Sequence, residues 1–227
     1  MIMQQTSVGE AVASAPHPRQ ESRSEMRVDA IVHVVGVTFG LAACITLAIL
    51  ALPDVGAAVL VSLEIYGAGL LTMLVCSALY NIAGRGLPNG LWRRLDHAAI
   101  FVMIAGTYTP FAVIAIGGAW GRGLLVFVWT MATVGVVLKL FHPEQLEMLS
   151  RTAYLLLGWT ILVGIDRLIA AVSLPALVLI VAGGMLYSAG VVFYCWDGLP
   201  YRRAIWHGFL LTAAACQYFA VLDVLAS

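Results

Sequence analysis

Seven long apolar runs constrain what this chain can fold into more than any other feature. They cover about residues 29–52, 57–82, 95–116, 122–141, 152–171, 175–196 and 203–225. Each run is close to the roughly 20 residues that an α-helix needs to cross a bilayer. The apolar residues are continuous and do not alternate with polar ones, which favours helices over barrel strands. The sequence therefore predicts an all-α, polytopic membrane protein: a bundle of seven transmembrane helices with short connections.

Composition supports this fold class and narrows the partners. Only 11% of the 227 residues are charged, against about 25% in a typical soluble domain, and the mean hydropathy is +0.96. The formal net charge is zero, so no basic surface indicates nucleic acid. We expect a multi-pass protein of the inner (plasma) membrane whose partner is membrane lipid. Runs of small residues leave open whether a second copy of the chain is also a partner.

The first 28 residues differ in composition from the rest of the chain. They are polar and contain no apolar segment that could act as a signal peptide. We expect residues 1–28 to form a disordered cytoplasmic tail whose last part, from about Ser22, is a short helical lead into the membrane. Residues 29–227 then form the seven-helix transmembrane domain, with no room for a separate soluble domain.

The distribution of Lys and Arg predicts the orientation of the bundle. Ten of the twelve lie on one side of the predicted helices, and only Arg122 and Arg167 lie on the other. Positive charge is enriched in cytoplasmic segments. The sequence therefore predicts a cytoplasmic N-terminus and an external C-terminus. The ten residues are Arg19, Arg23, Arg27, Arg85, Arg93, Arg94, Lys139, Arg151, Arg202 and Arg203.

Polar side chains from three predicted helices fall at the same depth, near the side that carries the positive charge. Ser77 and Asn81 end the second helix, Asp96 begins the third, and Arg203 and His207 begin the seventh. Residues four apart share a helix face. An ionisable group inside a membrane marks a functional site by default. The sequence therefore predicts one polar cluster inside the bundle that opens toward the cytoplasm.

Other polar residues have a simpler interpretation, because groups near helix ends can reach the membrane surface. We expect His97 and Arg202 to be interfacial. Asp166 and Arg167 are expected to form an ion pair at the external edge. The sequence leaves open whether His33 and Glu64 face the bundle or its surface.

Three blocks of sequence resemble a known family. They are Cys76-Ser77-Ala78-Leu79-Tyr80-Asn81, the stretch from Leu95 to Phe111, and Gly183 to Gly190 followed by Phe193-Tyr194 and Ile205-Trp206-His207. The segment from Asp29 to His33 and Gly36 adds to the match. Over about residues 29–225 the chain resembles the bacterial hemolysin III proteins, which belong with the progestin and adipoQ receptors, the adiponectin receptors among them.

The resemblance implies a seven-helix fold with the N-terminus inside, and a zinc site near the cytoplasmic face. Three histidines would bind the metal, assisted by a serine and an aspartate that match Ser77 and Asp96. Of the histidine positions, His207 is retained, but Asn81 and Arg203 stand at the other two. Asparagine is a weak ligand, and arginine cannot lose its proton to become one. We therefore expect no bound metal; zinc held through His207 and Asp96 is the alternative.

A hypothesis for these replacements follows from their charge. Arg203 would place a fixed positive charge where the metal would sit and pair with Asp96, and Asn81, Ser77 and His207 would complete a hydrogen-bonded network. Replacing Arg203 alone should then destabilise the protein.

Two functions remain open at this point. The missing histidines favour a regulator or lipid-sensing membrane factor with a degenerate metal site. The alternative is a zinc-dependent membrane hydrolase that acts on lipid amides, as ceramidases do, with Ser77, Asp96 and His207 as candidate catalytic residues. A transporter ranks last, because no inverted repeat is visible.

Overall fold

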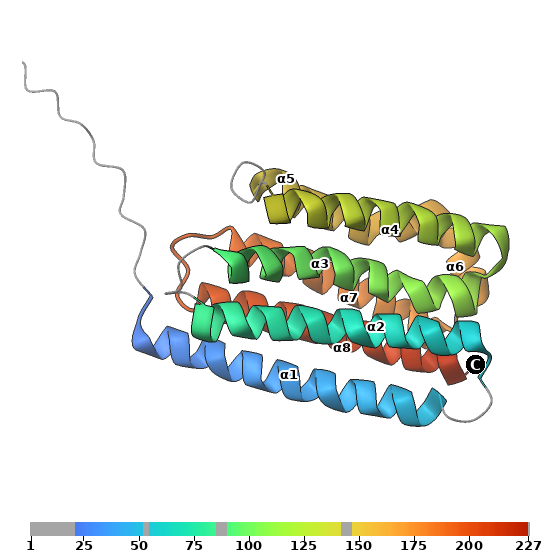
Figure 1. The fold of residues 1–227 in the computed structure, drawn as a ribbon, viewed down its shortest axis with the longest axis horizontal. Helices are drawn as coiled ribbons and strands as arrows, with labels where there is room; N and C mark the ends of the chain where they lie inside the picture. Colours follow the sequence, from blue (N-terminus) through green and yellow to red (C-terminus); the bar gives the residue numbers. More distant parts are fainter. Residues whose placement is uncertain (1–20, 52–54, 85–89, 142–146, 227) are drawn as a thin grey trace, which may run out of the picture.

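The chain folds into long helices that lie side by side (Figure 1). The structure, a computed structural model, describes residues 21–51, 55–84, 90–141 and 147–226. Seven helical spans are long and apolar enough to cross a membrane, which confirms the predicted all-α, multi-pass architecture. The helices are α1 (Arg23–Ala51), α2 (Ala57–Ala78), α3 (Leu91–Pro110), α4 (Gly118–Phe141), α5 (Glu147–Gly158), α6 (Ile165–Ala171), α7 (Leu174–Tyr194) and α8 (Arg202–Ala226).

The first helix begins earlier than the apolar run that predicts it. The Ser22 hydroxyl accepts a hydrogen bond from the Glu25 backbone N–H, and the Glu25 carboxylate accepts one from the Ser22 N–H. This reciprocal pair is a capping box, which satisfies donors that a helix start would leave free. The helical lead expected from about Ser22 is thus continuous with α1. Residues 1–20 of the predicted tail lie outside the described residues.

Three spans depart from regular α-helix. A π-helical segment, Leu79–Ala83, ends the second span, and another, Phe111–Ile116, ends the third directly after Pro110. The predicted helix over 152–171 is instead α5, a 3₁₀ segment Trp159–Gly164, and α6. Pro110 lacks the N–H that a regular helix requires, and π-helical turns often accompany functional sites. Apolar length alone does not reveal such changes of helix type.

Neighbouring helices follow one another in space in the order α7, α8, α1, α2, α3 and α4, and α5 packs against α3, α4 and α7. Small residues allow close approach between α2 and α3: a Cβ atom at Gly106 would lie 3.3 Å from the Ile65 carbonyl oxygen. The outward faces are apolar, and Val126, Val163 and Leu174 are each more than two-thirds exposed. Such faces suit contact with lipid chains, since a bilayer core offers no water to polar groups.

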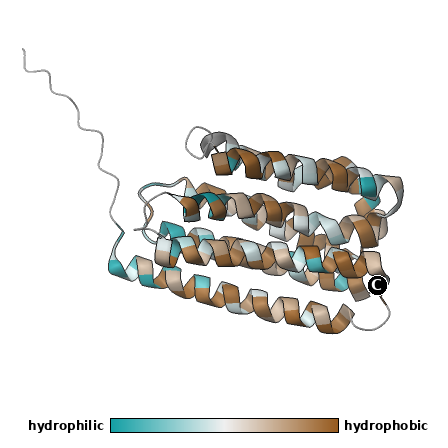
Figure 2. Ribbon diagram, in the orientation of Figure 1, coloured by the Kyte–Doolittle hydropathy of each residue, from teal (hydrophilic) through white to brown (hydrophobic). Residues whose placement is uncertain are grey.

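The two ends of the bundle differ in polarity. At one end, called here the arginine-rich end, α1, α3, α5 and α8 begin, and α4, α7 and the second span end. Figure 2 shows hydrophilic residues gathered there on several helices, and the C-terminus lies at the opposite end. Eight of the ten cations in the charge count belong to described residues; Arg19 and Arg85 lie outside them. Which end faces the cytoplasm stays a prediction.

Candidate functional site

A cavity of about 330 Å³ opens inside the arginine-rich end. Its wall is built by the second span and by α3, α4, α5, α7 and α8. All five residues of the predicted network lie on it: Ser77, Asn81, Asp96, Arg203 and His207. Three spans far apart in sequence thus bring together the side chains that the sequence placed at one membrane depth.

Ser77 forms hydrogen bonds with two other residues on the α2–α3 side of the cavity. Its hydroxyl is hydrogen-bonded to Asp96, and its oxygen atom lies 3.4 Å from the Asn81 side-chain nitrogen. Asn81 also donates to the Ser77 carbonyl oxygen over 2.9 Å. Ser77 and Asn81 are both buried. This half of the predicted network is present.

Arg203 differs from the prediction. Its Nε atom forms an ion pair with Glu21 Oε1 at 2.7 Å, whereas the sequence predicted a pair with Asp96. Arg203 is the second residue of α8, so its side chain can reach the chain segment that leads into α1. Its charge still acts on Asp96 from a distance. The pairing part of the network hypothesis is therefore wrong.

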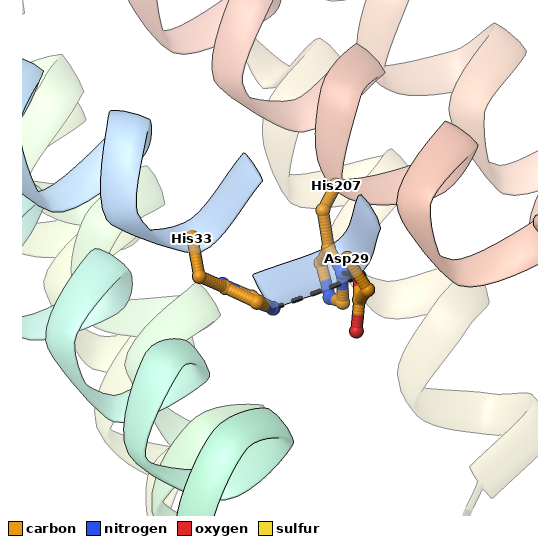
Figure 3. A group of neighbouring side chains, drawn as sticks. All are labelled: Asp29, His33 and His207. Atoms are coloured by element: carbon orange, nitrogen blue, oxygen red, sulfur yellow. Dashed lines mark hydrogen bonds and ion pairs between the residues drawn. The ribbon is translucent and has the colours of Figure 1, made fainter. Parts of the chain in front are cut away.

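His207 also has a partner outside the predicted network. Its Nδ1 atom lies 2.6 Å from Asp29 Oδ1, and both residues are buried. The His33 ring packs against the His207 ring with centroids 4.2 Å apart, and His33 Nε2 lies 3.8 Å from the same Asp29 oxygen atom. Figure 3 shows the three side chains converging from α1 and α8. His33, which the sequence left open, faces the bundle.

The residues in α1 and just before it that contact the start of α8 follow a regular spacing. Glu21, Glu25, Asp29 and His33 are each four residues apart; Glu25, Asp29 and His33 share one face of α1, and Glu21 precedes the helix by two residues. Glu21 reaches Arg203, and Asp29 reaches His207. Between them, the buried Glu25 carboxylate accepts a 2.7 Å hydrogen bond from the Tyr201 backbone N–H. This four-residue spacing is the signal that sequence reasoning missed; we call these residues the α1 ladder.

The cavity wall carries further cations. Arg93, Lys139 and Arg151 line it together with Arg203, and Asp96 is the one carboxylate among the described lining residues. Lys139 is only 2% exposed, whereas the sequence analysis counted it only among the positive charges of one side of the bundle. Lys139 is the only lysine of the chain, and it lies within an apolar run. A charged residue in such a run indicates a buried functional position, so the sequence could have identified it.

The two residues expected at the interface behave differently from each other. His97 lies on the wall of the cavity, and its backbone carbonyl accepts a hydrogen bond from the Tyr154 hydroxyl. Arg202 pairs with Asp197, whose side chain is 95% exposed. The interfacial interpretation thus fits Arg202 and does not fit His97.

A second, apolar cavity of about 140 Å³ lies deeper in the bundle. It extends past residues such as Phe111, Leu168 and Ile180. The two cavities share six lining residues: Met73, Ile100, Tyr154, Val191, Trp206 and Leu210. A polar chamber near the end of the bundle is therefore adjacent to an apolar chamber nearer its middle.

The residues at the implied zinc-ligand positions do not fit a metal. The Asn81 side-chain nitrogen donates hydrogen bonds to Ser77, and the Arg203 guanidinium is paired with Glu21. A different donor set is present nearby. One potential ligand atom from each of Asp29, His33 and His207 lies within 4.8 Å of the others. Two histidines and a carboxylate are a recognised zinc-binding combination, and Asp96 is not part of this group.

Fold and site together define a class: multi-pass membrane proteins with a buried cluster of carboxylate and histidine side chains at one end of a seven-span bundle. Comparison with known proteins gives the family. The model of the Haemolysin-III related family matches residues 22–218, and the chain belongs to that family.

Individual relatives agree with this assignment. The chain is similar to the "Hemolysin-3 homolog" of Bacillus subtilis (strain 168), with 37% identity over 194 residues, covering 86% of this chain and 91% of the relative. It is 36% identical to "Hemolysin-3" of Bacillus cereus, covering 86% of this chain and 89% of that protein. It is 29% identical over 164 residues to the "Monocyte to macrophage differentiation factor" of Homo sapiens, covering 69% of this chain and 67% of that protein.

Proposed function

We propose that this protein is a lipid-sensing regulator of the membrane, and that it binds an anionic amphiphile in the two adjoining cavities. The observation that carries the proposal is the pair of chambers with six shared wall residues. The headgroup would occupy the polar chamber and the chain would extend into the apolar one. The polar chamber alone has the volume of an ordinary ligand site, about 300–1,000 Å³.

The charge of the polar chamber indicates the sign of the headgroup. Among the residues that the structure describes, four cationic side chains and one carboxylate line it. Arginine and lysine favour carboxylate and phosphate groups, which guanidinium binds with two parallel hydrogen bonds. Three of the cations are Arg93, Arg151 and Arg203, at the end where positive charge is concentrated. With that end in the cytoplasm, as the charge distribution predicts, the site would sample lipids of the inner leaflet.

The experiment measures lipid binding to the purified chain in detergent. The probes are oleate, 1-oleoyl-lysophosphatidic acid and zwitterionic 1-oleoyl-lysophosphatidylcholine, titrated by native mass spectrometry. We expect the anionic probes to bind at least about tenfold more tightly than the zwitterionic one, a difference of about 1.4 kcal/mol. Equal affinities would contradict the proposed headgroup site.

Two pairs of variants test the two chambers separately. Arg151→Gln should weaken the anionic probes, while Arg122→Gln at the opposite end should not, because Arg122 is exposed and lines neither cavity. Val191→Phe fills the wall shared by the chambers and should weaken all three probes. Its neighbour Val192 is 66% exposed on the outer face, so Val192→Phe is the matched control. Equal effects of Val191→Phe and Val192→Phe would place the lipid elsewhere.

A second candidate function rests on a specific contact. The Ser77 hydroxyl bonded to Asp96 lies beside His207 on the cavity wall, a combination that can activate water or a hydroxyl group. This favours a membrane hydrolase acting on lipid amides. A serine–histidine–aspartate arrangement would need Ser77 bonded to histidine, and within the described part of the chain Ser77 is bonded to Asp96 and Asn81 instead. Fatty-acid release from ceramide by the wild type, lost in Asp96→Ala, would support the hydrolase.

A further inference from the structure

The cluster of Asp29, His33 and His207 lies beside the polar chamber and shares only His207 with the proposed lipid site. Of the three residues, only His207 lines the chamber. Asp29 and His33 come from α1, which contributes no residue to that wall. All three side chains are buried, with 2%, 6% and 7% of their surfaces exposed. The cluster therefore needs an explanation of its own.

We propose that Asp29, His33 and His207 form a binding site for a divalent transition-metal ion, held between α1 and α8, with zinc the ion that the donor set fits best. Imidazole and carboxylate groups suit zinc and related ions, and three protein ligands with one open position are typical of non-structural zinc sites. Nothing in the proposal depends on lipid binding by the cavities.

The geometry of the three donors is close to what a metal requires. Zinc–ligand bonds of about 2.0–2.2 Å with tetrahedral angles place ligand atoms about 3.3–3.5 Å apart. His207 Nδ1 lies 2.6 Å from Asp29 Oδ1, and His33 Nε2 lies 3.8 Å from it. All three donors lie within 4.8 Å of one another. Side-chain adjustments of about 1 Å would give the metal-bound arrangement.

The electrostatics of the cluster favour a cation. Two histidines converge on one oxygen atom of Asp29 from different helices. Asp96 lies near enough for its charge to interact with both Asp29 and His207. Two carboxylates close together in a low-dielectric interior repel each other, and a divalent ion bound beside His207 would compensate both charges.

The α1 ladder holds the site in register. Glu25 is hydrogen-bonded to the Tyr201 backbone, and Glu21 is ion-paired with Arg203. These contacts position the start of α1 against the start of α8, so that Asp29 and His33 face His207 without further movement of the backbone. A site assembled before binding avoids the cost of ordering its ligands.

The test measures metal directly. The chain is purified in detergent after removal of any affinity tag, and its Zn, Fe, Mn, Co, Ni and Cu contents are determined by mass spectrometry. Chelated protein is then titrated with Zn²⁺ and with Co²⁺, whose visible absorption reports a tetrahedral site. We expect about one ion per chain in the wild type, because the three buried donors form one group within the described part of the chain.

Single variants decide which residues hold the ion. Asp29→Asn, His33→Ala and His207→Ala should each weaken Zn²⁺ and Co²⁺ by more than about 100-fold, since loss of an outer-shell partner alone costs 10–100-fold. His97→Ala is the matched control, because His97 lies on the cavity wall outside the cluster; it should bind like the wild type. Helical circular dichroism and gel-filtration elution show that each variant is folded, and His33→Gln replaces His33→Ala if that variant is not.

Two results would overturn the proposal. One is a folded wild type that binds neither Zn²⁺ nor Co²⁺. The other is binding that survives in folded His33 and Asp29 variants, which would place the metal on other ligands, such as His207 with Asp96.

Discussion

The two ends of the bundle contain ionisable residues in very different settings. At the arginine-rich end, Asp29, His207 and Lys139 are buried, and the contact between Asp29 and His207 joins residues 178 positions apart. At the opposite end, Glu64 and Asp166 are exposed. The comparison separates polar residues that organise the interior from those that merely reach the membrane surface.

Arg167 shows how the opposite end accommodates a charge. Its guanidinium lies over the Trp120 ring, 4.7 Å from the ring centroid, whereas the sequence predicted an ion pair with Asp166. Neighbouring residues on a helix point in different directions, and aromatic rings are common at membrane boundaries. A cation stacked on an interfacial ring needs no buried partner.

The largest effect that should distinguish the two ends is the loss of Asp29. Asp29→Ala removes the partner of buried His207 and should lower the free energy of unfolding by about 3 kcal/mol, the lower end of the range for breaking a buried charged pair. Asp166→Ala, at an exposed position, should cost less than about 1 kcal/mol. Thermal and SDS unfolding in detergent measure both. Similar losses would contradict the contrast between the ends.

Glu25 should give the next largest effect. Each of its carboxylate oxygen atoms accepts a 2.7 Å hydrogen bond from a backbone N–H group, of Ser22 and of Tyr201. Hydrogen bonds to charged groups contribute about 1.5–3 kcal/mol, so Glu25→Ala should cost about 2 kcal/mol in the same unfolding assay. Glu64→Ala is the control, because Glu64 is exposed on α2. A neutral Glu25→Ala would show that the α1 ladder does not hold the helices together.

The seven spans could be predicted from the sequence because hydrophobic length alone decides whether a helix can cross a bilayer. Two polar positions near the cavity could also be predicted, because Asp96 and His207 stand out at the start of apolar runs. Pairings between helices could not. The four-residue spacing from Glu25 to His33 marks one face of α1, but nothing local indicates that α8 packs against it.

The error at Arg203 has the same origin. The sequence indicates at which end of the bundle Arg203 lies, but it does not indicate direction around the helix axis, and direction decides whether Arg203 contacts Asp96 or Glu21. The break between α5 and α6 was likewise invisible, since an apolar segment has the same composition in α and 3₁₀ form.

At the opposite end, we expect the largest loss of stability from replacing Ser173. It caps α7 by accepting a hydrogen bond from the Ala176 N–H, and its hydroxyl is hydrogen-bonded to Asp223 on α8. Loss of an N-cap costs about 1 kcal/mol, and Ser173→Ala should lower the free energy of unfolding by that amount. Ser173→Asp, which retains a capping oxygen atom but places it beside Asp223, separates the cap from the interhelical bond. A cost above that of Glu25→Ala would reverse the ranking of the two ends.

Arg203 should give the smallest effect at the arginine-rich end, in contrast to the expectation from sequence. Its ion pair with Glu21 is partly exposed, with 32% and 27% of the two side chains accessible. Such pairs contribute about 0–1 kcal/mol and weaken in salt, so Arg203→Ala should cost about 0.5 kcal/mol or less at high salt. Unfolding at low and high salt, with the double variant Glu21→Ala and Arg203→Ala to isolate the pair, measures this. A loss of about 3 kcal/mol independent of salt would mean that Arg203 supports the buried carboxylates after all, and that the arginine-rich end depends on its cations as much as on the α1 ladder.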